Sequence, residues 1–220
     1  MRVQKKHGAA AIALSALVVL GLSACTAPAA EESSEPTTPM TEEPMDMSGP
    51  QYADLVGPGC MAYAEQVPDG SGSIDGMAEA PVANAASSNP LLTTLVAAVS
   101  GQLNPDVNLV DTLNGGEFTV FAPVDDAFAK LDPATVESLK DPANAGLLTT
   151  ILTYHVVPGQ ILPSDLVGTT QTTVEGEDVT IGGTVDMMTV NDANVICGGV
   201  HTANATVYLI DSVLLPPSAG

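Results

Sequence analysis

The sequence has little positive charge and few aromatic side chains. Five lysines and arginines stand against 26 aspartates and glutamates, so the formal net charge is −21 at pH 7. Such a surface repels phosphate backbones and anionic lipid headgroups, which excludes nucleic-acid binding and polybasic membrane attachment. Tryptophan is absent and aromatic residues are 3% of the chain, so stacking platforms for sugars or single strands are scarce. Apolar residues are 45% of the chain, which is enough for a packed core.

The scarce basic residues are concentrated at the N-terminus. Three of the five lie within the first six positions, before an uncharged apolar run from 9 to 22. This predicts a secretory leader, since the run is too short for a comfortable membrane span. It ends in Leu22-Ser23-Ala24-Cys25, which resembles the bacterial lipobox, where the cysteine is acylated and the chain is cut before it. We predict a lipoprotein signal peptide over 1–24 and lipidation of Cys25; an ordinary signal peptide and an uncleaved anchor are the alternatives.

Cleavage before Cys25 changes the charge of the product. Lys130 and Lys140 become its only cations, and two lysines against 26 acids give a formal charge of −24. Attachment to a membrane must then come from lipid, and a thioether diacylglycerol supplies the two chains that stable anchoring requires.

Cysteine is scarce as well. With Cys25 assigned to lipid, Cys60 and Cys197 remain. An unmatched pair in an exported protein tends to be joined, so we predict a disulfide. In the chain-entropy treatment it would restrict the unfolded chain by about 4–5 kcal/mol. A redox pair and a metal site are the alternatives, but neither a Cys-x-x-Cys spacing nor a nearby histidine favours them.

The segment 25–50 is rich in proline, glutamate, threonine and methionine and almost lacks aliphatic residues. It cannot bury enough surface to offset its ordering entropy, so we predict a disordered acidic stalk. Met40, Met45 and Met47 could be interpreted as a copper(I) site, but thioethers in a flexible polar tract are more often simply tolerated.

Residues 51–76 are expected to form a helical extension that carries Cys60. The run 69–75 faintly resembles a calcium loop. It lacks glycine at the sixth position and glutamate at the twelfth, so we interpret it as an ordinary loop.

Residues 77–217 are expected to form one α+β domain. Asn89-Pro90 predicts the start of a helix that ends at Gly101. A strand over 117–121 and three further helices follow; the helices are expected from Asp125, from Asp132-Pro133 and over 147–155. Short strands separated by glycine- and aspartate-rich turns are then predicted over 172–174, 179–181, 187–190, 195–197 and 205–213. Helices first and antiparallel strands afterwards are typical of the α+β class.

Three ordered blocks resemble the fasciclin-like domain family. The blocks are Phe118–Leu131 (FTVFAPVDDAFAKL), Leu148–Gly159 (LTTILTYHVVPG) and Ile210–Pro216 (IDSVLLP). The stretches around Cys60, Gly101–Pro105 and Cys197–Gly199 resemble, more narrowly, the mycobacterial and actinobacterial lipidated surface antigens with a single fasciclin domain. The resemblance implies a wedge-shaped β-sandwich with helices packed on one side. It also implies adhesion or matrix interaction rather than catalysis.

In that family a tyrosine–histidine pair in the second block is discussed for both adhesion and domain stability, and it corresponds to Tyr154 and His155. His155 lies on the apolar stripe of its helix, where an imidazole is more often a hydrogen-bonded core residue than a ligand contact. We therefore predict that His155 stabilises the domain and reaches partners only indirectly.

No catalytic motif accompanies these residues. The sequence has no Gly-x-Ser-x-Gly elbow, no His-Glu-x-x-His and no phosphate loop. His201 is expected in a solvated loop, and Asp125 is interpreted as a helix cap rather than as half of a catalytic pair with Asp126. Asn204-Ala205-Thr206 matches the N-glycosylation sequon and is expected to be unmodified. We expect no enzymatic activity, no cofactor and no metal.

The leading hypothesis is an exported protein, lipid-anchored to the outer face of the bacterial membrane and also shed, that presents one domain to a protein or matrix ligand. The alternative is an envelope or immune-signalling lipoprotein whose acylated N-terminus is the active part. A third is an enzyme or metal carrier that uses His155, His201 or the stalk methionines.

Overall fold

The computed structural model of the chain describes residues 49–219. The predicted signal peptide, Cys25, the stalk up to residue 48 and its three methionines lie outside the described residues. Within residues 49–219, no helix is both long and apolar enough to cross a membrane.

A seven-stranded mixed sheet organises the fold, with the strand order β2-β1-β7-β6-β5-β4-β3. The strands are β1 (Phe118–Pro123), β2 (Val156–Pro158), β3 (Thr170–Thr172), β4 (Asp178–Gly183), β5 (Met188–Val190), β6 (Ala193–His201) and β7 (Ala205–Ile210). The five C-terminal strands pair antiparallel with one another; four lie where they were predicted, while β3 ends at Thr172, where the strand predicted over 172–174 was to begin. β1 pairs with β7 in parallel, with Phe118 opposite Ala205, an arrangement that strand periodicity does not specify.

The sheet curls so that its two ends approach each other. The backbone N–H of Val174, just after β3, donates to the carbonyl of Val156 in β2 at 2.7 Å. The faces of the predicted sandwich are therefore parts of one hydrogen-bonded sheet that closes nearly into a barrel. This confirms the α+β class.

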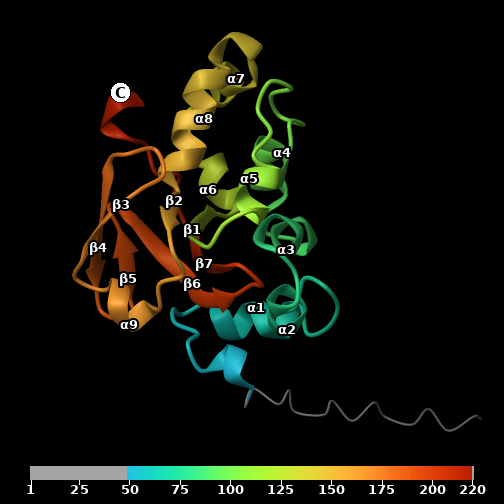
Figure 1. Cartoon of the computed structure of the whole chain (residues 1–220), viewed down its shortest axis with the longest axis vertical. Helices are drawn as coiled ribbons and strands as arrows, with labels where there is room; N and C mark the ends of the chain where they lie inside the picture. The colour runs from blue at the N-terminus through green and yellow to red at the C-terminus, as the bar shows by residue number, and fades with distance from the viewer. Residues whose placement is uncertain (1–48, 220) are drawn as a thin grey trace, which may run out of the picture. The chain divides into compact units, whose positions relative to one another are not determined.

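Most helices lie to one side of the strands (Figure 1). The α-helices are α1 (Cys60–Gln66), α2 (Ile74–Ala78), α3 (Val82–Ser88), α4 (Thr93–Val99), α5 (Val110–Asn114), α6 (Asp125–Ala129), α7 (Pro133–Lys140), α8 (Ala145–Tyr154) and α9 (Pro163–Leu166). Three 3₁₀ turns, η1 (Pro50–Tyr52), η2 (Pro142–Asn144) and η3 (Pro217–Ala219), complete the described residues. The short helices α3, α5 and α9 were not predicted, because few apolar residues repeat within each of them.

The helix predicted from Asn89 begins later than expected. α4 starts at Thr93, and the Asn89 side chain instead accepts a hydrogen bond from the backbone of Leu91 at 2.9 Å. The prediction at Asp132-Pro133 is confirmed, since the Asp132 carboxylate accepts from the N–H of Ala134 at the start of α7. Ser73 caps α2 in the same way, so the run 69–75 is a loop only up to that residue.

The core consists of two clusters on opposite faces of the sheet. β7 separates them: Val207 and Leu209 point into the cluster under the helices, while Tyr208 and Ile210 point into the cluster enclosed by the curled sheet. All six residues of β7 are buried, which explains why apolar side chains point to both faces of this strand, because a strand covered on both faces does not alternate.

The N-terminal segment contributes to the same core. Tyr63 of α1 and Met77 of α2 are both nearly inaccessible and belong to the cluster under the helices. The phenol of Tyr63 donates to the carbonyl of Gly72 and so holds the intervening turn.

Candidate functional site

Tyr154 and His155 lie at the end of α8 and are both buried, with exposed fractions of 1% and 3%. Tyr154 packs in the cluster enclosed by the sheet, whereas His155 borders the space beneath the helices. Neither side chain reaches the surface. A partner outside the domain would therefore contact other residues, whose positions depend on Tyr154 and His155. A direct binding role for the pair stays a prediction.

His155 uses both ring nitrogens. Its Nδ1 lies 2.7 Å from the carbonyl oxygen of Ile151, and its Nε2 lies 2.9 Å from the backbone nitrogen of Leu214. Because the Leu214 N–H is a donor, Nε2 must accept and Nδ1 must carry the proton. Burial lowers the pKa of His155 to about 4, against the smaller opposing effect of the hydrogen bond to Ile151. The neutral ring thus joins α8 to the segment after β7.

Tyr154 makes an equivalent connection on the other face. Its hydroxyl donates to the carbonyl of Asp178 at 2.9 Å and accepts from the side-chain amide of Asn191 at 3.0 Å. Asn191 has a positive φ of 49° in the turn between β5 and β6, and its amide oxygen also accepts from the N–H of Thr180. The tyrosine therefore fixes α8 against the β4–β5–β6 part of the sheet.

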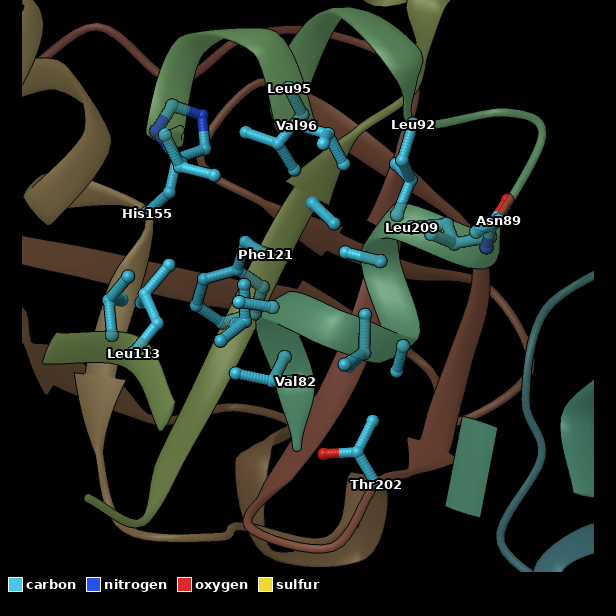
Figure 2. Close-up of a pocket in the computed structure, with 18 of the residues that line it drawn as sticks. Val82, Asn89, Leu92, Leu95, Val96, Leu113, Phe121, His155, Thr202 and Leu209 are labelled. Atoms are coloured by element: carbon cyan, nitrogen blue, oxygen red, sulfur yellow. The ribbon is translucent and has the colours of Figure 1, made fainter. Parts of the chain in front are cut away.

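A cavity of about 50 Å³ lies between the helices and the sheet, next to His155. Figure 2 shows residues of α3, α4 and α5 on one side of it and residues of the strands on the other. Its lining is apolar apart from Asn89, His155 and Thr202.

The N-terminal segment is held to β6 by a covalent bond and by polar contacts. The structure joins Cys60 to Cys197 in a disulfide. Val56 and Gly198 exchange two backbone hydrogen bonds of 3.0 and 2.7 Å beside it. A side-chain Cβ at Gly198 would come within 2.4 Å of the Tyr208 ring, so only glycine permits this close approach.

His201 departs from the prediction of a solvated loop. It is the last residue of β6, and its Nε2 lies 2.9 Å from an oxygen of the Asp54 carboxylate. The two residues are 147 positions apart, which is why sequence pattern could not relate them.

Asp125 is a cap, but of a different helix from the one predicted. It is the first residue of α6, and its carboxylate accepts from the N–H of Thr94 at 2.7 Å and from the hydroxyl of Thr93. Burial alone would raise the pKa of Asp125, but the hydrogen bonds from Thr93 and Thr94 outweigh it and hold the pKa below its usual value. Asp125 therefore connects α6 to the start of α4.

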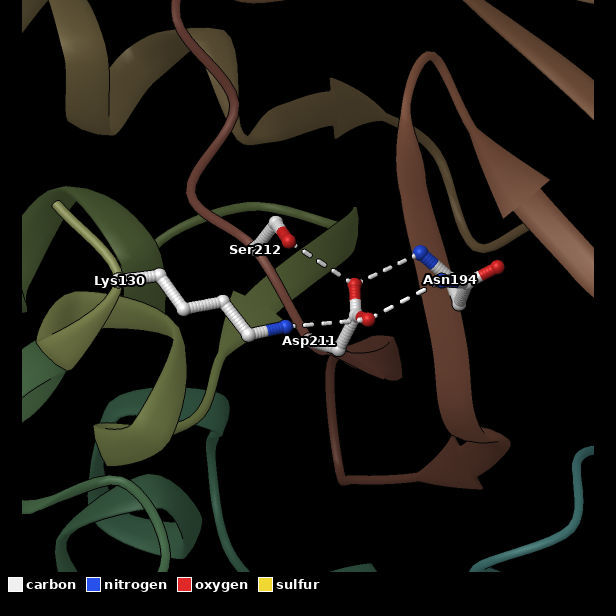
Figure 3. A network of polar contacts seen from close by, with 4 residues as sticks. All are labelled: Lys130, Asn194, Asp211 and Ser212. Atoms are coloured by element: carbon white, nitrogen blue, oxygen red, sulfur yellow. Dashed lines mark hydrogen bonds and ion pairs between the residues drawn. The ribbon is translucent and has the colours of Figure 1, made fainter.

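Asp211 gathers a polar network at the end of β7 (Figure 3). Its carboxylate accepts from the backbone N–H and the side-chain amide of Asn194, from Lys130 at 3.2 Å and from the hydroxyl of Ser212. Partial burial would raise the pKa of Asp211, but these donors, Asn194 foremost, lower it to about 2. The network connects β7 to β6 and to the end of α6.

Asn204, the first residue of the sequon, is fully engaged inside the fold. Its amide oxygen accepts from the N–H of Val82 at 2.8 Å, and its amide nitrogen donates to the carbonyls of Leu113 and Gly116. A glycan on this nitrogen would replace one of its two hydrogens, so one of these two hydrogen bonds would be lost. The contacts support the expectation that the site is unmodified.

Replacing Asn204 by aspartate is expected to destabilise the protein by about 2 kcal/mol, because two carbonyls lose their donor and face a carboxylate. Urea unfolding at pH 7 measures the change. Asn108→Asp is the matched control: Asn108 is exposed, and its oxygen accepts from the N–H of Val110, a bond that aspartate retains. Equal effects of the two variants would show that the added charge, not the lost donors, is responsible.

Among residues 49–219, no group of three histidine, cysteine, aspartate or glutamate side chains is placed to hold a metal ion. His155 is enclosed by apolar residues, and His201 lies with Asp54 near the disulfide.

The positioning residues Asn191, Asn194 and Asn204 were not predicted as a group. Asparagine in a turn is the sequence signal that could have marked them, because its short amide bonds to nearby backbone. That signal is common, and the partners of Asn204 lie about 90 residues away or more.

Comparison with known proteins agrees with this geometry. The fasciclin domain profile matches residues 90–216. The chain is 52% identical over 225 residues to the cell surface glycolipoprotein MPB83 of Mycobacterium bovis, covering 99% of both. It is 60% identical over 165 residues to the immunogenic protein MPB70 of the same species, covering 75% of this chain and 84% of MPB70.

A solved structure supports the fold. The FAS1 domain pair of the insect cell adhesion molecule fasciclin I superposes with a TM-score of 0.55 at 19% identity. The match covers 66% of this chain and 53% of the insect chain. From the matched profile, the mycobacterial relatives and the shared fold, we conclude that this chain belongs to the fasciclin domain family.

Proposed function

We propose that the protein is exported, attached to the outer face of the bacterial membrane through lipid on Cys25, and presents its fasciclin domain to a protein or matrix ligand. In this proposal 1–24 is the signal peptide, 25–50 the stalk, 51–76 the extension and 77–217 the domain. The name of MPB83, a cell surface glycolipoprotein that matches over nearly its whole length, supports the surface location.

The charge of the domain carries the proposal for the partner. Residues 49–220 contain twenty acids and two lysines. Both lysines are paired, Lys130 with Asp211 and Lys140 with Glu137. The described surface therefore attracts cationic partners and accelerates their association. We infer that the ligand presents a basic surface and that no catalysis is involved.

Binding of the purified domain to immobilised extracellular-matrix proteins and cell-wall fractions tests this function. A basic component should bind at about 50 mM salt and bind at least tenfold more weakly at about 500 mM, because salt screens exposed charges. Absence of binding to all fractions at low salt, or binding that is independent of salt, would contradict the proposal.

Charge reversal then identifies the binding face. Asp186→Lys with Asp192→Lys alters the turns that flank β5, and Asp106→Lys with Asp111→Lys alters the region of α5; all four carboxylates are exposed. The two double variants change the net charge equally. A loss of ligand binding in only one of them therefore locates the binding face at its two residues. Equal losses would indicate only a general charge effect.

A second candidate function is signalling by the acylated N-terminus. The name of the relative MPB83, a glycolipoprotein that matches 99% of this chain, favours considering it. Cys25→Ser should abolish signalling and leave ligand binding by the domain intact. Retention of signalling in that variant would contradict this candidate without affecting the first.

A further inference from the structure

We propose that the cavity beneath α3 and α4 receives the methyl end of an acyl chain from a lipid with an uncharged headgroup. The cavity lies between these helices and the strands β1 and β7, and its walls include Leu92, Val120 and Leu152. The inference goes beyond the proposed surface function, since it concerns an internal site and a different class of ligand.

Every polar group on the cavity wall already has a partner. His155 is held at both ring nitrogens, and the hydroxyl of Thr202 donates to the carbonyl of Ala205 and accepts from its N–H. Asn89 accepts from Leu91 and directs its amide nitrogen to the sulfur of Met77. Little is left for water beyond the second N–H of the Asn89 amide, and largely apolar cavities of this kind stay dry and bind apolar molecules.

The size of the cavity limits the ligand to a narrow apolar group. Its volume of about 50 Å³ corresponds to roughly three to five water-sized spheres. A methylene group occupies about as much space as a water molecule, so the cavity accommodates the last few carbons of a chain. A longer part of the ligand must lie outside.

The small side chains of α3 create the space and border its opening. Ala83, Ala85 and Ala86 all line the cavity. Ala86, together with Val96 of α4 and Leu113 of α5, is only half-buried, so the cavity approaches solvent where these three helices meet. Both ends of α3 are held: side-chain amides accept hydrogen bonds from the N–H groups of Val82 and Ala83 at its start, and the buried Asn89 accepts from Leu91 at its end.

The surroundings of this opening select the headgroup. Asp111 on α5 and Asp106 before it are exposed, and both lysines are ion-paired at other acids. A carboxylate or phosphate headgroup would be repelled there, whereas a sugar or another uncharged headgroup would not. The chain therefore enters methyl end first, with its headgroup left in water.

Octyl glucoside below its micelle concentration is the probe, followed by NMR of the Val120 and Leu152 methyl groups in the full domain. We expect saturable shifts and contacts from the terminal methyl of the probe to these groups. Octanoate, which has a similar chain and an anionic head, should bind at least tenfold more weakly. Vesicles of an uncharged lipid should broaden the same signals if the ligand comes from a membrane.

Two variants separate cavity binding from surface adsorption. Ala85→Val adds two methyl groups to the wall and should abolish the shifts, while Ala97→Val, on a half-buried alanine of α4 that does not line the cavity, should retain them. If Ala85→Val fails to fold, Val96→Phe is used in its place. This variant narrows the opening of the cavity and should also abolish the shifts. Three results would overturn the proposal. The cavity could bind xenon but not octyl glucoside, octanoate could bind as tightly as octyl glucoside, or Ala85→Val could show the same shifts as the natural protein. Matrix binding by Ala85→Val should be unchanged, so this proposal and the surface function can fail independently.

Discussion

Replacing Cys60 and Cys197 together by alanine is expected to lower the free energy of unfolding by about 5 kcal/mol in the chain-entropy treatment. The disulfide spans 137 residues, and a loop of that length is strongly restricted in the unfolded state. Small domains have about 5–15 kcal/mol in total, so a large share of the stability depends on this bond. Guanidinium unfolding of the oxidised protein and the double variant measures the difference.

The effect should be local as well as global. Without the disulfide, only non-covalent contacts hold the segment before α1 to β6, among them the hydrogen bonds of Val56 with Gly198 and of Gly59 with Ile196, and the contact of Asp54 with His201. Hydrogen exchange at Val56, Gly59 and Gly198 should accelerate more than exchange in β7. Reduction of the natural protein serves as the control and should reproduce the double variant. A change in stability below about 1 kcal/mol would contradict the expectation.

Acidification from pH 7 to pH 4 is expected to remove about 3 kcal/mol of stability through His155 alone. The imidazole titrates near 6.5 in the unfolded chain, and burial lowers its pKa to about 4 in the fold. Between these values the unfolded state binds the extra proton. The contribution is therefore complete above pH 6.5, falls as the pH decreases from 6.5 to 4, and changes no further below 4.

Structure explains the size of this effect. A proton on Nε2 would turn an acceptor into a donor opposite the N–H of Leu214 and would place a charge beside the apolar cavity. The carboxylates behave differently: the lowered pKa values of Asp125 and Asp211 mean that their stabilisation is lost only as the pH falls below about 4.

His155→Gln tests the assignment, because glutamine can accept from Leu214 but does not titrate in this range. In urea unfolding, its stability should change far less between pH 6.5 and 4 than the stability of the natural protein does. Parallel profiles for His155→Gln and the natural protein would contradict the prediction. If His155→Ala left the melting temperature unchanged and abolished ligand binding, the stabilising role of His155 would be wrong and direct contact would be favoured.

The elements that could be predicted are those whose signal is local. The mostly apolar strand β7 and the apolar stripe of α8 follow from spacing along the chain. The cap at Asp132 is likewise a contact between near neighbours. The cysteine pair was predictable because only two cysteines remain once Cys25 is assigned to lipid.

Other parts of the site depend on contacts between distant segments. Periodicity placed Asp125 at a helix start but could not show that its carboxylate caps α4, whose first residues lie about 30 positions earlier. The sequon pattern at Asn204 likewise gave no indication that the amide connects α3, α5 and the start of β1. A side chain's own sequence neighbours do not specify which backbone groups will lack partners after folding.

By itself, the sequence determined the acidic charge, the scarcity of cations, the helix-then-strand order and the pair of cysteines, because each is a property of composition or of spacing within about ten residues. The burial of His155 was predicted from its helical stripe, but tertiary structure alone decided the parallel pairing of β1 with β7, the packing of Tyr154 in the other cluster, and the apolar cavity. The physical reason is that a cavity is the volume left between packed elements. It depends on how small side chains of α3 lie against a sheet that is completed only by the last strand.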